Sequence, residues 1–500
     1  MQPVELKSEP LERQSAAPLR ESAAWFGIAA LSLFFLATSL YISAHRLFWF
    51  DELFTVMYAG LPNWRLVSDA LAHADNQTPV SYYLLMFPVD RFFGNIHIAA
   101  RLPSALAMTA GLIIIFDCVR RLTDGLGGLI AVAFLTCSFL PYYGYEARSY
   151  GIYFMLGALS LWLWLHTRAD RKVPAALFGL TLLVAMLVQY YAVLLIVPYA
   201  LWEALRWRPW QRPSLKLIAG AVGLGAAVLL LLGQIRGAAG HNATFWAKPS
   251  PYALQQAYSE FFPSGLFLLA LVIVWIVVAR TDGASRTVLP MAPPEHVGWL
   301  FLTIPLAGFV VAELVTKAFV PRYFIGLLPG TALAFSSMLW RYFSKDQRVR
   351  LGIVALLASF GVYEQLQTVR NPELADPYHL QSQTHQILGM EAGLHKDGKQ
   401  YILCANSMLF LDAFYYSRTP DQYAFVVVSP EQSETGTTRL LAALARYYPL
   451  HLWTIEDLRK HARESALVEP RADLLDAIRK AGIRTIIQGD RPLQTVYFEE

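Results

Sequence analysis

The stretch that decides the fold is WFGIAALSLFFLATSLYISA at residues 25–44, followed directly by HRLFWFDE at residues 45–52. An apolar run of this length is enough to cross a bilayer as one helix. It lacks a convincing small-residue cleavage site, so we expect a retained signal anchor. Two adjacent carboxylates, Asp51 and Glu52, stand at the mouth of this span. Charges are costly near hydrocarbon, so their position predicts a function at the membrane surface.

The composition extends this prediction to the whole chain. Of the 500 residues, 55% are hydrophobic and 16% are charged, and the mean hydropathy is +0.38. Soluble proteins contain about a quarter charged residues, so we expect a mainly α-helical, multi-pass membrane protein surrounded by lipid. Three cysteines are too few for a disulfide framework and are expected to be packing residues. No nucleic acid is expected among its partners.

Further apolar runs predict about eleven transmembrane helices. Their approximate limits are 24–44, 99–119, 126–142, 150–166, 174–190, 191–206, 215–235, 264–280, 298–316, 322–341 and 350–369. The connections that would be cytoplasmic with an inside N-terminus all carry Lys or Arg, whereas the opposite short connections carry few. This alternation predicts an inside N-terminus and, with an odd number of spans, an outside C-terminus.

The chain is therefore expected to have three parts. These are a cytoplasmic tail at 1–23, a transmembrane catalytic domain at 24–369 with a first outer loop at 45–98, and an extracytoplasmic domain at 370–500. In the outer loop we expect short helices at 52–59 and 64–73 and an interfacial helix at 79–93. Beyond residue 370, strand-like runs alternate with amphipathic helices, which predicts a small accessory α/β domain.

The acidic pair has two interpretations on its own residues. Asp51 and Glu52 could simply be charged residues at the end of a span, with Arg46 as partner. Alternatively, one carboxylate is a general base or a ligand of a divalent cation, and the other sets its pKa or its orientation.

Several motifs follow the pair in a fixed order. They are Asp75-Asn76-Gln77-Thr78-Pro79-Val80-Ser81-Tyr82-Tyr83, Arg91-Phe92-Phe93-Gly94, Ala100-Arg101-Leu102-Pro103-Ser104, Tyr145-Glu146-Ala147-Arg148-Ser149-Tyr150, Gln189-Tyr190-Tyr191-Ala192 and Pro321-Arg322-Tyr323-Phe324. Across about 20–345 the chain thereby resembles the GT-C superfamily of membrane glycosyltransferases, families 39 and 83, in the branch of protein O-mannosyltransferases and the lipid A aminoarabinose transferase. Thr78-Pro79-Val80 replaces the Pro-Pro-Leu of that branch, and Gln77 stands where His or Lys is frequent, so the sugar and the metal stay open.

The resemblance implies transfer of a hexosyl or pentosyl group from a polyprenyl-phosphate donor to a lipid, glycan or protein acceptor. The reaction would be an inverting displacement outside the cytoplasm, at a bacterial inner membrane. Asp51 would be the catalytic base, assisted by Glu52, and Asp51 could hold Mg²⁺ or Mn²⁺, whereas no nucleotide cofactor is expected. The residues implied to bind the donor phosphate or sugar are Asp75, Arg101, Glu146, Arg148, Arg322 and Tyr323.

Each of these donor-binding residues also has a structural alternative. Arg322 and Arg148 are the first candidates for the phosphate, because guanidinium groups bind it in a bidentate fashion, and Arg101 is the third. Arg322 could instead extend to the interface from a helix start, Arg148 could pair with Glu146, and Arg101 could form a helix-end ion pair. Asp75 could cap a helix.

Two rival functions belong to other classes. A transporter or flippase of lipid-linked sugars would bind its substrate near the midplane of the membrane, on broken helices with intramembrane charge. Asp117 is the one charge placed plainly inside a predicted span, and it lies one turn from a basic end. A non-catalytic scaffold would leave Asp51 and Arg322 without a common purpose. His73, His97 and His241 show no metal-ligand spacing and are expected to be interfacial polar residues.

Overall fold

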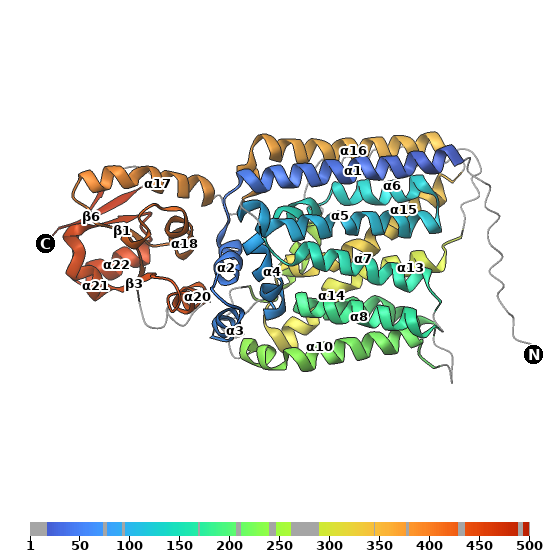
Figure 1. The fold of residues 1–500 in the computed structure, drawn as a ribbon, viewed down its shortest axis with the longest axis horizontal. Helices are drawn as coiled ribbons and strands as arrows, with labels where there is room; N and C mark the ends of the chain where they lie inside the picture. Colours follow the sequence, from blue (N-terminus) through green and yellow to red (C-terminus); the bar gives the residue numbers. More distant parts are fainter. Residues whose placement is uncertain are drawn as a thin grey trace, which may run out of the picture.

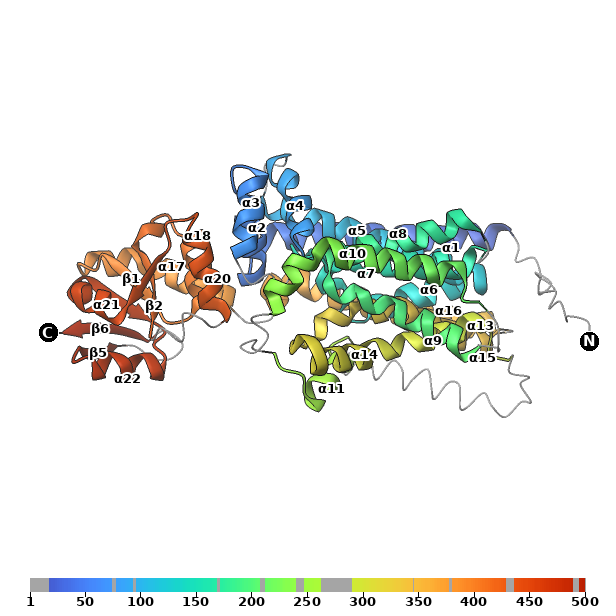
Figure 2. The ribbon, with the colours of Figure 1, turned by 90° about the horizontal axis from the view of Figure 1, so that it is seen from below.

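The computed structural model describes residues 18–73, 78–92, 96–168, 171–206, 212–239, 247–261, 290–344, 346–376, 380–428, 436–488 and 494–499. The predicted span at 264–280, Asp75 and His241 lie outside these residues. A bundle of long helices carries a smaller domain with a β-sheet at one end, as Figures 1 and 2 show from two sides.

Within the described residues, six helical stretches are long and apolar enough to cross a membrane: Glu21–His45, Ile96–Leu122, Leu215–Gly237, Pro293–Thr316, Pro321–Tyr342 and Gln347–Arg370. Of five shorter apolar helices in the described residues, Val80–Val89 belongs to the first outer loop, and four accompany the long helices: Gly125–Thr136, Tyr150–His166, Lys172–Val188 and Tyr190–Leu205. These stretches fall on the predicted spans outside 264–280, which confirms an integral membrane protein. The exact number of crossings stays a prediction.

The bundle is built from α1 (Pro18–His45), α5 (Ile96–Leu122), α6 (Gly125–Thr136), α7 (Tyr150–His166), α8 (Lys172–Val188), α9 (Ile196–Leu205), α10 (Leu215–Ala239), α13 (Pro293–Leu300), α14 (Ile304–Val311), α15 (Leu328–Tyr342) and α16 (Gln347–Arg370). Its short helices are η1 (Leu140–Tyr145), η2 (Tyr190–Leu195), η4 (Phe301–Thr303), η5 (Ala312–Thr316) and η6 (Pro321–Leu327), and η7 (Pro372–Ala375) follows α16 at the start of the C-terminal part. Small residues allow close packing: a Cβ on Gly223 of α10 would lie 2.2 Å from the carbonyl oxygen of Gly179 on α8.

The first outer loop folds into the helices expected from its sequence. They are α2 (Phe50–Ala59), α3 (Trp64–His73) and α4 (Val80–Phe92), and the second outer loop contains α11 (Pro251–Ser259). The side chains of α2 are almost all buried, because this helix lies between the end of the bundle and the sheet domain (Figure 1). The residue pair at its start is therefore enclosed on several sides.

The C-terminal part forms the predicted α/β domain. Its strands are β1 (Tyr401–Cys404), β2 (Tyr423–Val427), β3 (His451–Thr454), β4 (Ser465–Val468), β5 (Arg484–Gln488) and β6 (Thr495–Glu499), in the order β3-β2-β1-β4-β6-β5. The first four are parallel, and β6 joins β4 and β5 in antiparallel register. The helices are α17 (Leu380–Lys396), α18 (Ser407–Tyr416), α20 (Gly436–Leu444), α21 (Ile455–His461) and α22 (Ala472–Lys480).

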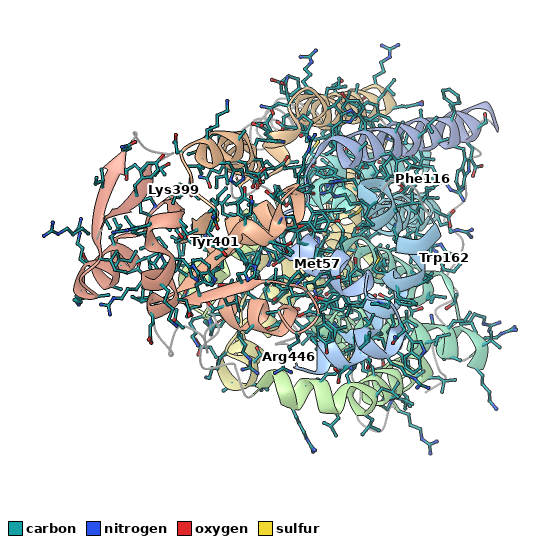
Figure 3. All side chains as sticks on the ribbon, turned by 60° about the vertical axis from the view of Figure 1, so that its left-hand side comes forward. Met57, Phe116, Trp162, Lys399, Tyr401 and Arg446 are labelled. Carbon is teal, nitrogen blue, oxygen red and sulfur yellow. The ribbon has the colours of Figure 1, made fainter. Side chains whose placement is uncertain are left out.

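The sheet domain packs directly on the outer-loop helices. The Tyr448 hydroxyl donates to the carbonyl oxygen of Met57 at 2.6 Å, and the Tyr447 hydroxyl donates to Asp69 on α3 at 2.6 Å. In Figure 3, Met57 lies between the bundle, marked by Trp162, and the sheet domain, marked by Tyr401. The start of α2 is thus enclosed by both domains.

Candidate active site

The first turn of α2 presents the acidic pair. The backbone N–H of Trp49, the residue before the helix, donates to the Glu52 carboxylate at 3.2 Å, and the Glu52 N–H donates to the Trp49 carbonyl at 2.8 Å. This reciprocal arrangement starts the helix at Phe50. Carboxylates in a first turn also interact favourably with the positive end of the helix dipole. The local sequence therefore fixes where both acids lie.

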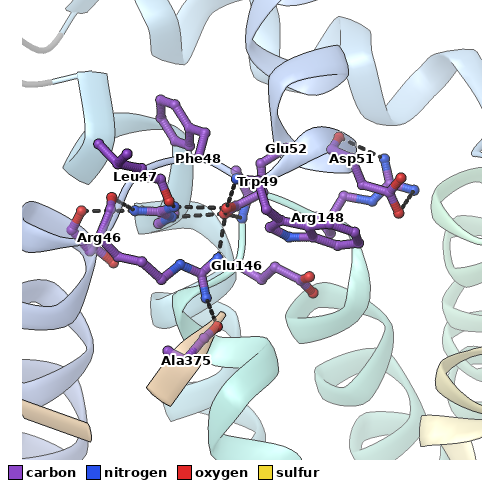
Figure 4. A network of polar contacts seen from close by, with 12 residues as sticks. Arg46, Leu47, Phe48, Trp49, Asp51, Glu52, Glu146, Arg148 and Ala375 are labelled. Atoms are coloured by element: carbon purple, nitrogen blue, oxygen red, sulfur yellow. Dashed lines mark hydrogen bonds and ion pairs between the residues drawn. The ribbon is translucent and has the colours of Figure 1, made fainter. Parts of the chain in front are cut away.

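Asp51 lies between two arginine side chains, as the close-up in Figure 4 shows for Arg148. Its Oδ2 accepts a hydrogen bond from Nη2 of Arg322 at 2.9 Å and lies 3.8 Å from Nη2 of Arg148. Arg148 also donates through Nη1 to the Asp51 carbonyl at 3.2 Å. The Asp51 side chain keeps 17% of its surface exposed. The Asp51 carboxylate is therefore accessible enough to contact a ligand.

The two arginines come from distant parts of the chain. Arg322 is the second residue of η6, which leads into α15, and its guanidinium lies 5.5 Å from the centre of the Trp49 ring. Arg148 belongs to the connection between η1 and α7, and its Nη2 donates to Thr78 at 3.3 Å. The ion pair that Arg148 forms is therefore with Asp51, and not with the Glu146 that the sequence offered as an alternative. Two positive charges converge on one point, as expected of a phosphate site.

Glu52 faces the opposite way and is fully buried. Arg101 donates to both of its oxygens at 2.7 Å, Arg46 donates at 2.6 Å, and the backbone N–H of Ala147 donates at 2.7 Å. Burial raises the pKa of Glu52, but Arg101 and Arg46 lower it more strongly, to about 2. Glu52 therefore stays ionised with both oxygens occupied.

This buried network ties the end of α1 to the start of α2. Arg101 also donates to the carbonyl oxygens of Ser43, Arg46 and Leu47 at 2.8–2.9 Å. Such contacts are those of a helix-end ion pair. The geometry gives Glu52 and Arg101 a positioning role, whereas the substrate contacts predicted for them stay predictions.

Glu146 is a second candidate acid beside the arginines. It is 1% exposed, and its Oε1 accepts a hydrogen bond from the Tyr142 hydroxyl at 3.4 Å. Burial and the charge of Glu52 raise its pKa to about 7, although Arg322, among other arginines, acts in the opposite direction. A carboxyl group with this pKa can change its charge near neutral pH.

The remaining predicted residue in the described part, Tyr323, is buried beside Arg322 and packs its ring 4.9 Å from that of Tyr191. Sequence reasoning missed Glu260, which ends α11 and accepts a hydrogen bond from the Tyr143 hydroxyl at 2.7 Å. Burial raises the pKa of Glu260, and Arg322 opposes that effect. No local motif marks Glu260, because its neighbours come from other loops.

In the described part of the chain, the charged groups that contact the Asp51 carboxylate are guanidinium groups and not metal ligands. In the described residues, no group of three or more His, Cys, Asp or Glu side chains is arranged to hold a metal ion. Asp51 faces Arg322 and Arg148 instead, and these charges attract an anion and repel a cation. Of the histidines, His97 stacks on Phe48 with ring centres 4.4 Å apart, which is a packing role.

The chain resembles known proteins in part of its sequence and in its fold. Residues 76–232 match the family model described as dolichyl-phosphate-mannose-protein mannosyltransferase. The fold is similar to the crystal structure of ArnT from Cupriavidus metallidurans in the apo state, with a TM-score of 0.60 and 10% identity over 95% of this chain and 98% of that one. It is equally similar to ArnT from the same organism bound to undecaprenyl phosphate, with a TM-score of 0.60 and 12% identity over the same shares. No curated protein matches the chain in sequence. The resemblance to the GT-C branch that contains ArnT and the protein mannosyltransferases is confirmed, and at these identities the two structures show a shared fold.

Proposed function

We propose that this protein is a membrane glycosyltransferase that moves a hexosyl or pentosyl group from a polyprenyl-phosphate carrier to an acceptor hydroxyl. The observation that carries the proposal is the convergence of Arg322 and Arg148 on Asp51. A partly exposed carboxylate between two guanidinium groups combines a proton acceptor with a phosphate site. The ArnT structure with bound undecaprenyl phosphate supports a polyprenyl carrier as the donor lipid.

The reaction follows from these charges. The donor phosphate binds to Arg322 and Arg148 and replaces part of their interaction with Asp51. Asp51 then accepts the proton of the acceptor hydroxyl, whose oxygen forms the new bond to the anomeric carbon. The bond from that carbon to the phosphate oxygen breaks, with inversion, and the electron pair leaves with the polyprenyl phosphate. The arginines stabilise the charge that grows on the phosphate as it departs.

We propose that the site lies on the extracytoplasmic side of a bacterial inner membrane. The basic ends of the bundle lie opposite the sheet domain: Arg120 and Arg121 are in the last turn of α5, and Arg341 is in the last turn of α15. The positive-inside rule places that end in the cytoplasm. A reporter fused after Glu500 should then be active only if it works outside the cytoplasm.

The transporter alternative would need a charged substrate-binding residue within the membrane, and Asp117 is the candidate that the sequence offers. Asp117 forms ion pairs with Arg120 at 2.7 Å and Arg121 at 2.6 Å, and it accepts a hydrogen bond from Trp162 at 2.8 Å. These partners lie in the last turns of α5 and on α7. Asp117 is therefore a paired structural residue near the end of a helix, which does not suit a substrate site at the midplane.

Purified protein tests the proposal directly. Asp51→Asn should abolish sugar transfer from a set of polyprenyl-phosphate hexoses and pentoses while the protein still inserts and folds. Asp69→Asn is the matched control, because Asp69 is an exposed carboxylate in the same outer loop and should retain activity. Sugar transfer at the normal rate by a folded Asp51→Asn protein would contradict the assignment.

A further inference from the structure

We propose that the C-terminal domain positions the catalytic segment, and that Tyr416 and Gln381 are its positioning residues. The segment concerned is residues 46–49, which connects α1 to α2 and ends two positions before Asp51. This inference rests on the function proposed above, and it assigns that function a second domain as part of its machinery. An accessory domain would have no reason to bind this segment.

Two backbone N–H groups in the middle of the segment, those of Leu47 and Phe48, donate to side chains of the C-terminal domain. Leu47 N–H donates to the side-chain oxygen of Gln381, on α17, at 3.2 Å. Phe48 N–H donates to the Tyr416 hydroxyl, at the end of α18, at 2.6 Å. The Arg46 guanidinium reaches the carbonyl oxygen of Ala375, in η7, at 2.9 Å (Figure 4). Three consecutive residues thus contact three elements of the chain beyond α16.

The carbonyl groups of the same segment are satisfied from the membrane domain. Arg101 donates to the carbonyl oxygens of Arg46 and Leu47 at 2.9 and 2.8 Å. A buried backbone outside regular structure needs partners for both its N–H and C=O groups. Here the C-terminal domain supplies acceptors for the N–H groups of Leu47 and Phe48, and Arg101 of the membrane domain supplies donors for the carbonyl groups of Arg46 and Leu47. Neither domain alone therefore fixes the path of the chain into α2.

Aromatic packing reinforces the same contact. The His97 ring, at the start of α5, stacks on Phe48 at 4.4 Å with an interplanar angle of 6°. Its ring centre lies 5.8 Å from that of Tyr416, with an angle of 21°. Tyr416 is therefore fixed by packing as well as by its hydrogen bond, which makes its hydroxyl a precise partner for the Phe48 N–H.

The consequence for Asp51 is geometric. Asp51 follows Phe48 by three positions, and its carboxylate must approach the acceptor hydroxyl closely to accept a proton. A misplacement of about 1 Å can reduce a rate by about a hundredfold. Tyr416→Phe removes the hydroxyl and keeps the ring, so we expect a partial displacement and a decrease in kcat of about tenfold. KM for the donor should change little, because Arg322 and Arg148 remain in place.

The experiment compares two hydroxyl deletions across the same domain junction. Tyr416→Phe removes a contact to the segment, whereas Tyr447→Phe removes the contact to Asp69 on α3 and leaves the segment unchanged. We expect faster amide hydrogen exchange in peptides covering 46–50, together with the lower kcat, for Tyr416→Phe alone. Gln381→Leu, which removes the acceptor for Leu47 N–H, should act in the same direction.

The outcomes separate this inference from the proposed function. If the wild type transfers sugar and the Tyr416→Phe and Tyr447→Phe variants have the same kcat, the positioning role is overturned and the proposed function is not. Faster exchange at 46–50 with an unchanged kcat also overturns it, because the segment would then be mobile without consequence. A wild-type protein that transfers no sugar from any polyprenyl-phosphate donor overturns the proposed function itself.

Discussion

Glu52→Gln should destabilise the protein strongly, although it changes a single atom type. The substitution keeps the shape of the side chain and removes its charge. Arg46 and Arg101, which are 1% and 0% exposed, would then be buried without a counter-charge. Removing one partner of a buried ion pair costs about 3–5 kcal/mol, because the remaining charge is desolvated and uncompensated.

The pKa of Glu52 gives a second measure of the same interaction. It falls from 4.5 to about 2 in the folded protein, and at about 1.4 kcal/mol for each pKa unit this corresponds to roughly 3 kcal/mol. Because the folded pKa is lowered, this stability is fully present above pH 4.5 and is lost as the pH falls towards 2. We therefore expect a loss of about 3 kcal/mol for Glu52→Gln at neutral pH.

The assay is thermal unfolding of the detergent-purified protein beside a transfer assay, with Asp51→Asn as the comparison. We expect Glu52→Gln to melt well below the wild type. Asp51→Asn should melt closer to the wild type but be inactive, because Asp51 and Arg322 are partly exposed. Adding Arg46→Met to Glu52→Gln should recover part of the stability, because one uncompensated charge is removed. A Glu52→Gln protein with normal melting and no activity would refute this reasoning and assign Glu52 a chemical role.

Three further predictions concern the ligand side of the site. Arg322→Ala should reduce kcat/KM for the donor by the equivalent of about 2–4 kcal/mol. Arg322→Lys should restore only part of this loss, because an ammonium keeps the charge but lacks the bidentate fork. An Ala variant with normal donor kinetics and a lower melting temperature would show that Arg322 only anchors the helix. KM for the donor should rise as the pH increases through about 7, because ionised Glu146 then competes with the phosphate for the arginines, and Glu146→Gln should flatten that profile; a slope that persists in this variant assigns the titration to another group. EDTA should leave transfer intact, because Asp51 faces guanidinium groups; loss of activity that Mg²⁺ or Mn²⁺ restores would contradict this.

Much of the site could be predicted because its signals are local. An apolar run, a basic end and a short amphipathic helix are each determined by neighbouring residues. The outer-loop helices therefore lie within a few residues of their predicted limits. Arg322 and Arg148 could be singled out as anion-binding residue types at the outer ends of predicted spans, and the structure brings both to Asp51.

The rest depends on contacts between distant segments. Glu260 and Tyr416 carry no motif. Glu260 gains its contact only when the second outer loop packs against η1, and Tyr416 only when the C-terminal domain packs against the first outer loop. Arg101 was predicted to contact the donor because it is an arginine in a family-like motif. Nothing in the sequence indicates that Glu52 would occupy its guanidinium from 49 positions away.

The different roles of Asp51 and Glu52 follow from the helix that contains them. Successive side chains of an α-helix point about 100° apart, so two adjacent acids at its start cannot face the same surroundings. The fully buried Glu52 faces Arg46 and Arg101, whereas Asp51, with 17% of its side chain exposed, faces Arg322 and Arg148. Glu52 holds the first turn against the bundle, so that Asp51 can remain close to two positive charges and still reach a ligand. We therefore infer that the pair acts as one unit in which the buried acid fixes the geometry and the exposed acid performs the proton transfer.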